Sequence, residues 1–415
     1  MLLASDFLGG PLPTSDFEVR VESLSIGDRE FRDVVLSGVY DRHANLHLTC
    51  ELPTDPQNLL SEINVEVTAS WVGSATTSMI ITQIQVGIPH SRYRFVPRFQ
   101  PTSIGTVEDA DHVEAVLLNG PSLGNPSFDV EYDGVKIRVD QLPTVDSFRK
   151  ERRMHKFDYL ATHLVKLQVP AGESLSSDKA HSVLAKLADF LSFVRGGHCG
   201  LGNVVGTRNG LRAFTRLGFM KLDYFDVETG WFGMGLHHDA LALFNLYTAL
   251  SPNDLSVVRR TVEYYCASNV ARDSSPATAL IASHAGLETI VPHILSTSAG
   301  WSSKQFETPF HNKLRAAAEY AGIVGEILEH SPDLKSKAAS LQFDSFRTLA
   351  KVRNQVTHPT TAVSYGRMEL FEAWQTSQWL CEVFLFFLMG YRGTMYDRRR
   401  YTGWRGPSVS VPLPS

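Results

Sequence analysis

The order of apolar and polar residues divides the chain into two regions with different periods. Up to about residue 145, apolar and polar residues alternate in short runs such as FEVRVESL, ANLHLTCEL, INVEVTASWV and SMIITQIQV. Alternation with a period of two is typical of strands that bury one face. Asp133-Gly134 and Asn209-Gly210 each separate two such runs and predict two-residue hairpin turns. We therefore expect a β-rich region, a sandwich or an open barrel, over residues 1–235.

Helical spacing appears once inside this region and dominates after it. Apolar residues three and four apart predict a helix near residues 177–195, which Gly196-Gly197 should end. Further helices are expected to begin with Asp254 as cap, to carry Pro276 in a first turn, and to cover Phe310 to His330, Leu341 to Pro359 and Met368 to Tyr391. Short connections predict an antiparallel bundle over residues 251–395, followed by a tail over 396–415. The predicted fold class is α+β.

Composition places the chain among soluble globular proteins, since 43% of its residues are hydrophobic and 20% are charged. A net charge of -5 argues against a general nucleic-acid coat protein. From residue 251 onward there are 17 basic and 14 acidic residues, which leaves 22 and 30 of the totals of 39 and 44 for the preceding part. The helical region is therefore the better partner for a polyanion.

The cysteines and the apolar runs predict a cytoplasmic protein. Four cysteines lie far apart and form no CxxC pair, so no disulfide framework is indicated. The longest apolar run, around Leu380 to Tyr391, is interrupted by Glu382 and is too short to span a bilayer. The first residues, MLLASDFLGGPLP, lack the basic segment of a signal peptide. A zinc site made of His198, Cys199 and the His237-His238-Asp239 segment is a weaker alternative, since adjacent ligands rarely form one.

The end of the helix predicted over residues 341–359 combines residue types that suit RNA chemistry. Asn354 and His358 are i and i+4 neighbours on one face, and Arg353 lies beside them. Pro359 disfavours helical geometry at His358, so the helix should end there. A histidine at a helix C-terminus can act as an acid or a base near neutral pH, and an arginine binds phosphate oxygens. Catalytic roles are therefore assigned to Arg353, Asn354 and His358.

The pattern Arg353-Asn354-x-x-x-His358 resembles the signature of the HEPN superfamily of helical ribonucleases. The bare spacing of Arg and His is weak evidence, because Arg42 with His47 and Arg149 with His155 show it as well. The pair Arg353 and His358 differs from these two because an asparagine follows the arginine and because the pair lies at the end of a predicted helix. The likeness covers roughly residues 276–391, and a β-rich region before such a bundle is similar to the ApeA-like antiphage branch.

The resemblance implies a metal-independent RNA endonuclease without a cofactor, acting in antiphage defence or abortive infection. It implies a homodimer formed through the helical region, in which two motif helices build one active site. The N-terminal region would then restrain the nuclease or sense a phage-derived or nucleic-acid trigger. Proposed RNA-binding residues are Arg347, Lys351, Arg398, Arg399 and Arg400, the last three within the arginine- and aromatic-rich segment YDRRRYTGWR. This segment is either an RNA contact or a tail that packs on its own domain. Glu288 and the basic run FRKERRMHK, residues 148–156, are either further site elements or solvated side chains.

Two other interpretations remain open at this point. The bundle could be catalytically silent and bind nucleotide, RNA or a partner protein. Alternatively, the motif could be a plain helix end in which Asn354 and His358 satisfy terminal carbonyls and Arg353 pairs with a surface acid.

Overall fold

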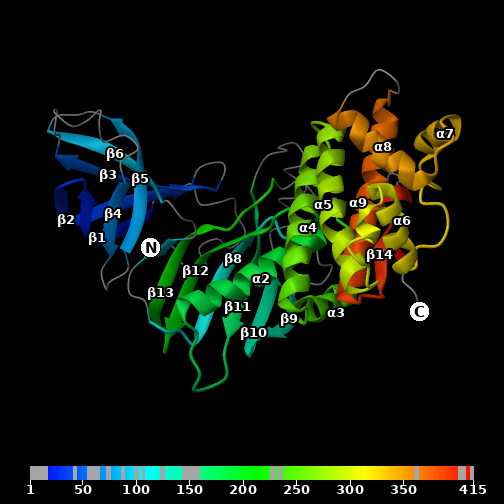
Figure 1. The fold of residues 1–415 in the computed structure, drawn as a ribbon. Coiled ribbons are helices and arrows are strands. Elements are labelled where there is room, and N and C mark those ends of the chain that lie inside the picture. The colour runs from blue at the N-terminus through cyan, green and yellow to red at the C-terminus, as the bar shows by residue number, and fades with distance from the viewer. Residues whose placement is uncertain are drawn as a thin grey trace. The chain divides into compact units, whose positions relative to one another are not determined.

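A computed structural model of the chain describes residues 17–40, 44–53, 66–71, 76–85, 89–97, 102–104, 108–121, 127–142, 159–224, 230–231, 237–358, 364–400 and 408–411. It contains two compact units. The first consists of residues 1–120, 125–188 and 199–226, and the second of residues 121–124, 189–198 and 227–415. The first unit is β-rich and the second is helical (Figure 1), which confirms the predicted α+β class.

The first unit begins with a closed six-stranded antiparallel barrel. Its strands are joined in the order β1-β2-β3-β6-β5-β4, and β4 pairs back onto β1. Alternate residues of each strand point inward and form the core, with Leu24, Leu36, Met79, Tyr93 and Phe95 fully buried. The strand bounds are β1 Phe17–Ile26, β2 Arg29–Tyr40, β3 Leu46–Pro53, β4 Glu66–Trp71, β5 Thr76–Gln85 and β6 His90–Pro97.

A seven-stranded sheet follows in the same unit, in the order β7-β13-β12-β8-β11-β10-β9. Both predicted hairpin turns are confirmed: Asp133-Gly134 joins β9 to β10, Asn209-Gly210 joins β12 to β13, and all four residues have positive φ. The strand bounds are β7 Thr102–Ile104, β8 His112–Leu118, β9 Ser127–Tyr132, β10 Val135–Gln141, β11 Ala161–Gln168, β12 Gly200–Arg208 and β13 Leu211–Phe219.

Helix α2 spans Ser177–Arg195, as the sequence predicted, and its part in the first unit lies across the sheet (Figure 1). Lys179 pairs with Asp133 of the β9–β10 turn, and Lys186 lies over the ring of Tyr132. The barrel is tied to the sheet through Tyr40, whose hydroxyl bonds the Asn203 side chain and accepts from the backbone N–H of Gly218 at 3.1 Å. The β-rich region is thus a closed barrel and a separate sheet sharing a core, a division that alternation alone did not reveal.

The second unit is a helical bundle built around α5 and α9. Helix α5 contacts α4, α6, α8 and α9, and α9 is buried along most of its length. The helix bounds are α3 His237–Thr248, α4 Pro252–Ala271, α5 Pro276–Thr297, α6 Phe310–Tyr320, α7 Pro332–Ser340, α8 Ser345–Thr357 and α9 Arg367–Met389, with a 3₁₀ turn at Gln305–Glu307. No helix among the described residues is long and apolar enough to cross a membrane.

Two sequence-based expectations for the helices were wrong, and two helices were not predicted. The helix expected over residues 310–330 ends at Tyr320, because Gly322 and Gly325 adopt positive φ and the chain then turns. Helix α7 is a separate element, and α3 was not foreseen. The N-cap of α4 is Ser251 and not Asp254, since the Ser251 side chain accepts from the Asp254 backbone N–H at 3.2 Å.

The segment expected as a C-terminal tail packs against the bundle, which is one of the two alternatives that the sequence left open. It forms β14 Thr394–Tyr396, a 3₁₀ turn at Arg398–Arg400 and β15 Ser408–Ser410, and β14 pairs with β15. The turn contacts α9. Residues 396–400 therefore belong to the helical unit and not to a separate tail.

Candidate functional site

Helix α8 presents a buried face and an exposed polar face. Asp344 caps it, because its carboxylate accepts from the Arg347 backbone N–H at 3.0 Å. Ser345, Thr348, Leu349 and Val352 form the buried face. Arg347, Lys351, Asn354 and His358 follow one another at helical spacing and are all exposed. The exposed face is therefore a polar and basic stripe along the whole helix.

Arg353 lies between the two faces and is held from two sides. Its side chain is 27% exposed, and its Nη2 atom is 3.0 Å from Oε1 of Glu288 on α5. Its Nη1 atom donates to Oδ1 of Asn354 at 3.2 Å. A guanidinium has five N–H groups, so each terminal nitrogen keeps one N–H in an orientation that these two partners fix. Each terminal nitrogen of Arg353 therefore has one N–H left that these two contacts do not use.

His358 stands at the C-terminal end of α8. Its backbone N–H donates to the carbonyl of Asn354 at 2.8 Å, and the residue leaves helical geometry with φ -135° and ψ 76°. The helix thus ends where the sequence predicted. Its imidazole is exposed at the negative end of the helix dipole.

His284 completes the surroundings of Arg353 and was not singled out from the sequence. It lies on α5 one turn before Glu288, has 0% exposure, and packs near the ring of Phe310. Both ring nitrogens lack a hydrogen-bond partner among the described residues. Burial, together with the charge of Arg353, lowers the pKa of His284 to about 3. The i,i+4 spacing of His284 and Glu288 was the sequence signal that could have revealed this pair.

The structure thus brings Arg353, Asn354 and Glu288 together and places His358 one turn beyond them. Neutral His284 cannot serve as a general acid near pH 7. It therefore adds no charge near Arg353 at neutral pH. Of the two histidines, only His358 is exposed.

Arg347 and Lys351 extend the site along α8. Arg347 is exposed and lies over the ring of Phe343, with 4.3 Å between its Cζ atom and the ring centroid. Arg315 on α6 pairs with Asp344 at 2.7 Å, so the one acid at the start of α8 is already neutralised. The two cations remain available to a phosphate backbone.

Arg398 and Arg399, expected to contact RNA, are structural instead. The Arg398 side chain is 7% exposed and its Nε atom donates to the fully buried Glu382 at 3.1 Å. Arg399 lies over the ring of Trp379 and pairs with Asp397 at 2.8 Å. Arg400 is 43% exposed but pairs with Asp397 at 3.5 Å. The segment looked like an exposed tail because its packing partners on α9, Trp379 and Glu382, lie elsewhere in the sequence.

The structure describes two other sequence candidates only in part or not at all. Nε2 of His198 lies 3.3 Å from Glu263, and among the described residues no group of three or more His, Cys, Asp or Glu could hold a metal ion. The side chains of residues 237–239, and the basic run at 148–156, lie outside the described residues.

Comparison with known proteins gives two matches, both to domains of one family. Residues 109–226 match the family model of the YopA central domain, and residues 252–409 match that of the YopA C-terminal domain. The first match covers most of the seven-stranded sheet with α2, and the second covers the bundle from α4 to β15. No curated protein and no solved structure matches the chain. Over these two consecutive segments, the chain is similar to the central and C-terminal domains of YopA.

Proposed function

We propose that the chain is a metal-independent RNA endonuclease of the HEPN type, and that its helical unit carries the active site. The observation that supports this most directly is the fixed guanidinium of Arg353, which is placed between Glu288 and Asn354 and followed one turn later by the exposed imidazole of His358. Phosphate binding and proton transfer are the two tasks of such a reaction, and these residues suit them.

In the proposed reaction, a ribose 2′-OH loses its proton to a base and its oxygen attacks the neighbouring phosphorus. The bond from phosphorus to the 5′ oxygen breaks, and the leaving oxygen takes up a proton. The products are a 2′,3′-cyclic phosphate and a 5′-OH. His358 serves as base or acid, Arg353 stabilises the charge on the phosphoryl oxygens, and Asn354 orients Arg353.

One copy of the motif supplies one imidazole, whereas the reaction needs both a base and an acid. We therefore propose a homodimer in which two α8 helices face each other across the RNA. The exposed stripe of Arg347, Lys351, Asn354 and His358 is suited to such a shared site, because it leaves the motif open at the surface. A role in antiphage defence, cytoplasmic location and regulation by the β-rich unit belong to the same proposal.

A silent bundle that binds nucleotide, RNA or a partner protein is the second candidate. The ion pair between Arg353 and Glu288 favours it, because a guanidinium that already has a counterion has less affinity for phosphate. The two candidates differ in whether RNA is cut, which a direct assay decides.

The test is incubation of the full chain with mixed cellular RNA in EDTA, in parallel with Arg353→Ala and His358→Ala. We expect cleavage by the parent alone, with 2′,3′-cyclic phosphate ends identified by mass spectrometry. Arg272→Ala, which removes an arginine paired with exposed Asp273 at the end of α4, is the matched control. Expression in cells adds a second readout, since the parent should be toxic and the two motif variants should not. A parent that neither cuts RNA nor differs from its variants in toxicity would refute the nuclease.

A further inference from the structure

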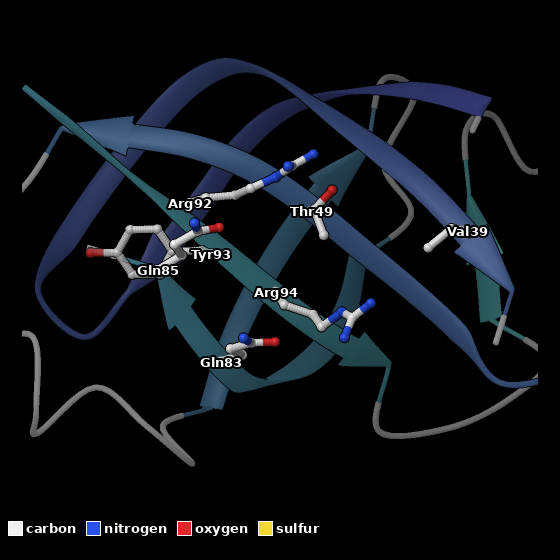
Figure 2. A pocket seen from close by; sticks show the side chains of 7 residues that line it. All are labelled: Val39, Thr49, Gln83, Gln85, Arg92, Tyr93 and Arg94. Carbon is white, nitrogen blue, oxygen red and sulfur yellow. The ribbon is translucent and has the colours of Figure 1, made fainter. Parts of the chain in front are cut away.

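The outer face of the barrel carries a polar hollow of about 250 Å³ (Figure 2). It lies over strands β2, β3, β6 and β5, which are neighbours in the barrel. The polar side chains of Arg92 and Arg94 come from β6, those of Gln83 and Gln85 from β5, and that of Thr49 from β3. Tyr93, between the two arginines, is fully buried and belongs to the barrel core. Apart from Tyr93, the lining residues named here are therefore polar side chains that the barrel does not need for its own packing.

Strand register explains why these residues gather. Gln83 and Thr49 are the partners of Arg94 on the two flanking strands, and Gln85 is the partner of Arg92. Because side chains alternate along a strand, Arg92 and Arg94 point to the same face. Arg94 and Gln83 therefore form one cross-strand pair, and Arg92 and Gln85 form the adjacent pair on the same face.

A β-bulge in β5 brings the glutamines to this face. Met79 and Ile81 point into the barrel, and simple alternation would place Gln83 and Gln85 inside as well. The register shifts between Ile81 and Gln83, so that Thr82 is an additional residue and both glutamines turn outward. Bulges commonly re-aim side chains next to functional sites.

Neither arginine of the hollow is held in an ion pair within the part of the chain that the structure describes. Among the described residues neither Arg92 nor Arg94 forms an ion pair, and no acidic residue lines the hollow. Glu51 lies opposite Arg92 in the register but makes no ion pair with it within 4.0 Å. Two unpaired guanidiniums a single residue apart repel each other, and a shared anion between them removes that cost.

We propose that this hollow binds the phosphate of a nucleotide. Arg92 and Arg94 hold the phosphate oxygens, since the guanidinium fork matches phosphate geometry. The amides of Gln83 and Gln85 and the hydroxyl of Thr49 donate and accept hydrogen bonds, which suits the polar edges of a base or a sugar. The volume is small for a ligand pocket, so one nucleotide is the largest unit that it can enclose.

A single strand held by base stacking fits the hollow less well. Such binding uses exposed aromatic rings, and the one aromatic residue of the lining has its ring inside the barrel. The proposal is independent of α8 and of RNA cleavage. Phosphate could reach the site on a free nucleotide or at the end of a strand, and the probes below separate these sources.

Isothermal titration of the full chain with ATP, inorganic phosphate and a ten-residue oligouridylate tests the proposal. We expect the parent to bind ATP saturably, and Arg92→Gln/Arg94→Gln to weaken the affinity at least tenfold. Arg20→Gln, an exposed arginine of β1, is the matched control and should leave the affinity unchanged. Tighter binding of ATP than of the oligouridylate identifies a free nucleotide as the ligand, and the reverse order identifies a strand end.

The variant Gln83→Glu distinguishes a loss of ATP binding from a loss of folding. It places a carboxylate opposite Arg94, so it should abolish ATP binding while the melting temperature stays equal to that of the parent or rises. Three results would overturn the proposal: no saturable ATP binding by the parent, equal affinity in the double arginine variant, or inorganic phosphate bound as tightly as ATP.

Discussion

Glu288 on α5 holds Arg353 on α8 at 3.0 Å, so the arginine of the candidate site is oriented by a neighbouring helix and not by its own alone. The contact joins residues 65 positions apart, and no pattern within the α8 segment signals it. The ion pair fixes the direction of the Arg353 side chain, and the Glu288 carboxylate offsets its positive charge. Glu288 is accordingly a positioning residue for the proposed reaction.

Glu288→Ala should lower kcat for RNA cleavage about tenfold, because Arg353 loses one of the two contacts that fix it. Glu288→Gln keeps an acceptor at the same place and should recover most of that loss. KM should change little in both variants. A purely structural role would instead give equal activity in all three proteins, once their folded fractions are matched by circular dichroism.

The stability cost of Glu288→Gln should be only about 0.5 kcal/mol, since both side chains are partly exposed. Urea denaturation checks this. A loss of several kcal/mol would show that the pair maintains the bundle rather than the site.

Buried His284 should make the fold sensitive to acid. In the unfolded chain His284 takes up a proton with the ordinary histidine pKa of 6.5, whereas in the folded chain burial lowers that pKa to about 3. The unfolded state therefore binds more protons between these values, and stability falls as pH decreases. The expected loss between pH 7 and pH 5 is about 2 kcal/mol from this residue.

Urea denaturation at pH 7 and pH 5 tests this, with His284→Met compared to the parent. Methionine has no proton to bind, so the variant should lose about 2 kcal/mol less than the parent on acidification. Equal pH dependence of the two proteins would show that His284 titrates normally in the folded state.

Arg398 should matter for stability and not for RNA affinity. It is buried against Glu382, accompanied by Tyr265 and Asn269, whose side-chain oxygens lie 3.0 and 3.2 Å from its terminal nitrogens. Burial opposes the charge on Arg398, but the Glu382 carboxylate outweighs it and raises the pKa of the guanidinium. Arg398→Met leaves the buried Glu382 carboxylate with the Tyr265 hydroxyl as donor at 2.6 Å but without a positive partner, and should cost about 3–5 kcal/mol.

Arg400→Met is the control, with an expected change below about 0.5 kcal/mol because that side chain is 43% exposed. The double variant Glu382→Leu/Arg398→Met should be more stable than Arg398→Met, since it removes both charges. Unchanged stability in Arg398→Met, with weakened RNA binding, would restore the expectation drawn from the sequence.

The proposed dimer predicts interference between intact and altered chains. Subunits should be mixed under exchange conditions with a threefold excess of His358→Ala, and RNA cleavage measured at constant parent concentration. If each site needs both copies, activity should fall to about a quarter. Activity that stays equal to that of the parent alone would mean that each chain acts by itself.

Local signals in the sequence were sufficient for the turns and for most helices. The two hairpins required only dipeptides that tolerate positive φ, and α8 ended at His358 because of the following proline. Stripes of apolar residues revealed α2, α4, α5 and α9. These features depend on interactions among residues that are near in sequence.

Features that depend on contacts between distant residues could not be predicted from local patterns in the sequence. The pairing of β1 with β4 closes the barrel, and only the fold brings these strands together. Arg398 looked like a ligand for RNA because Glu382 is buried in another element. Helix α6 ended early because two glycines at positive φ outweighed a continuing apolar stripe. The candidate catalytic residues came from a motif, whereas Glu288 and His284 became its neighbours only through the packing of α5 on α8.

Thr82 gives strand β5 one residue more than its partner β6 at that point. Deleting it would place Gln83 directly after the inward-pointing Ile81, so that strict alternation would keep Gln83 and Gln85 on the outer face, opposite Arg94 and Arg92. The direction of the glutamines therefore depends on which residues of β5 pair with the two arginines. The register between β5 and β6 is thus the character by which to judge whether another sequence keeps the hollow.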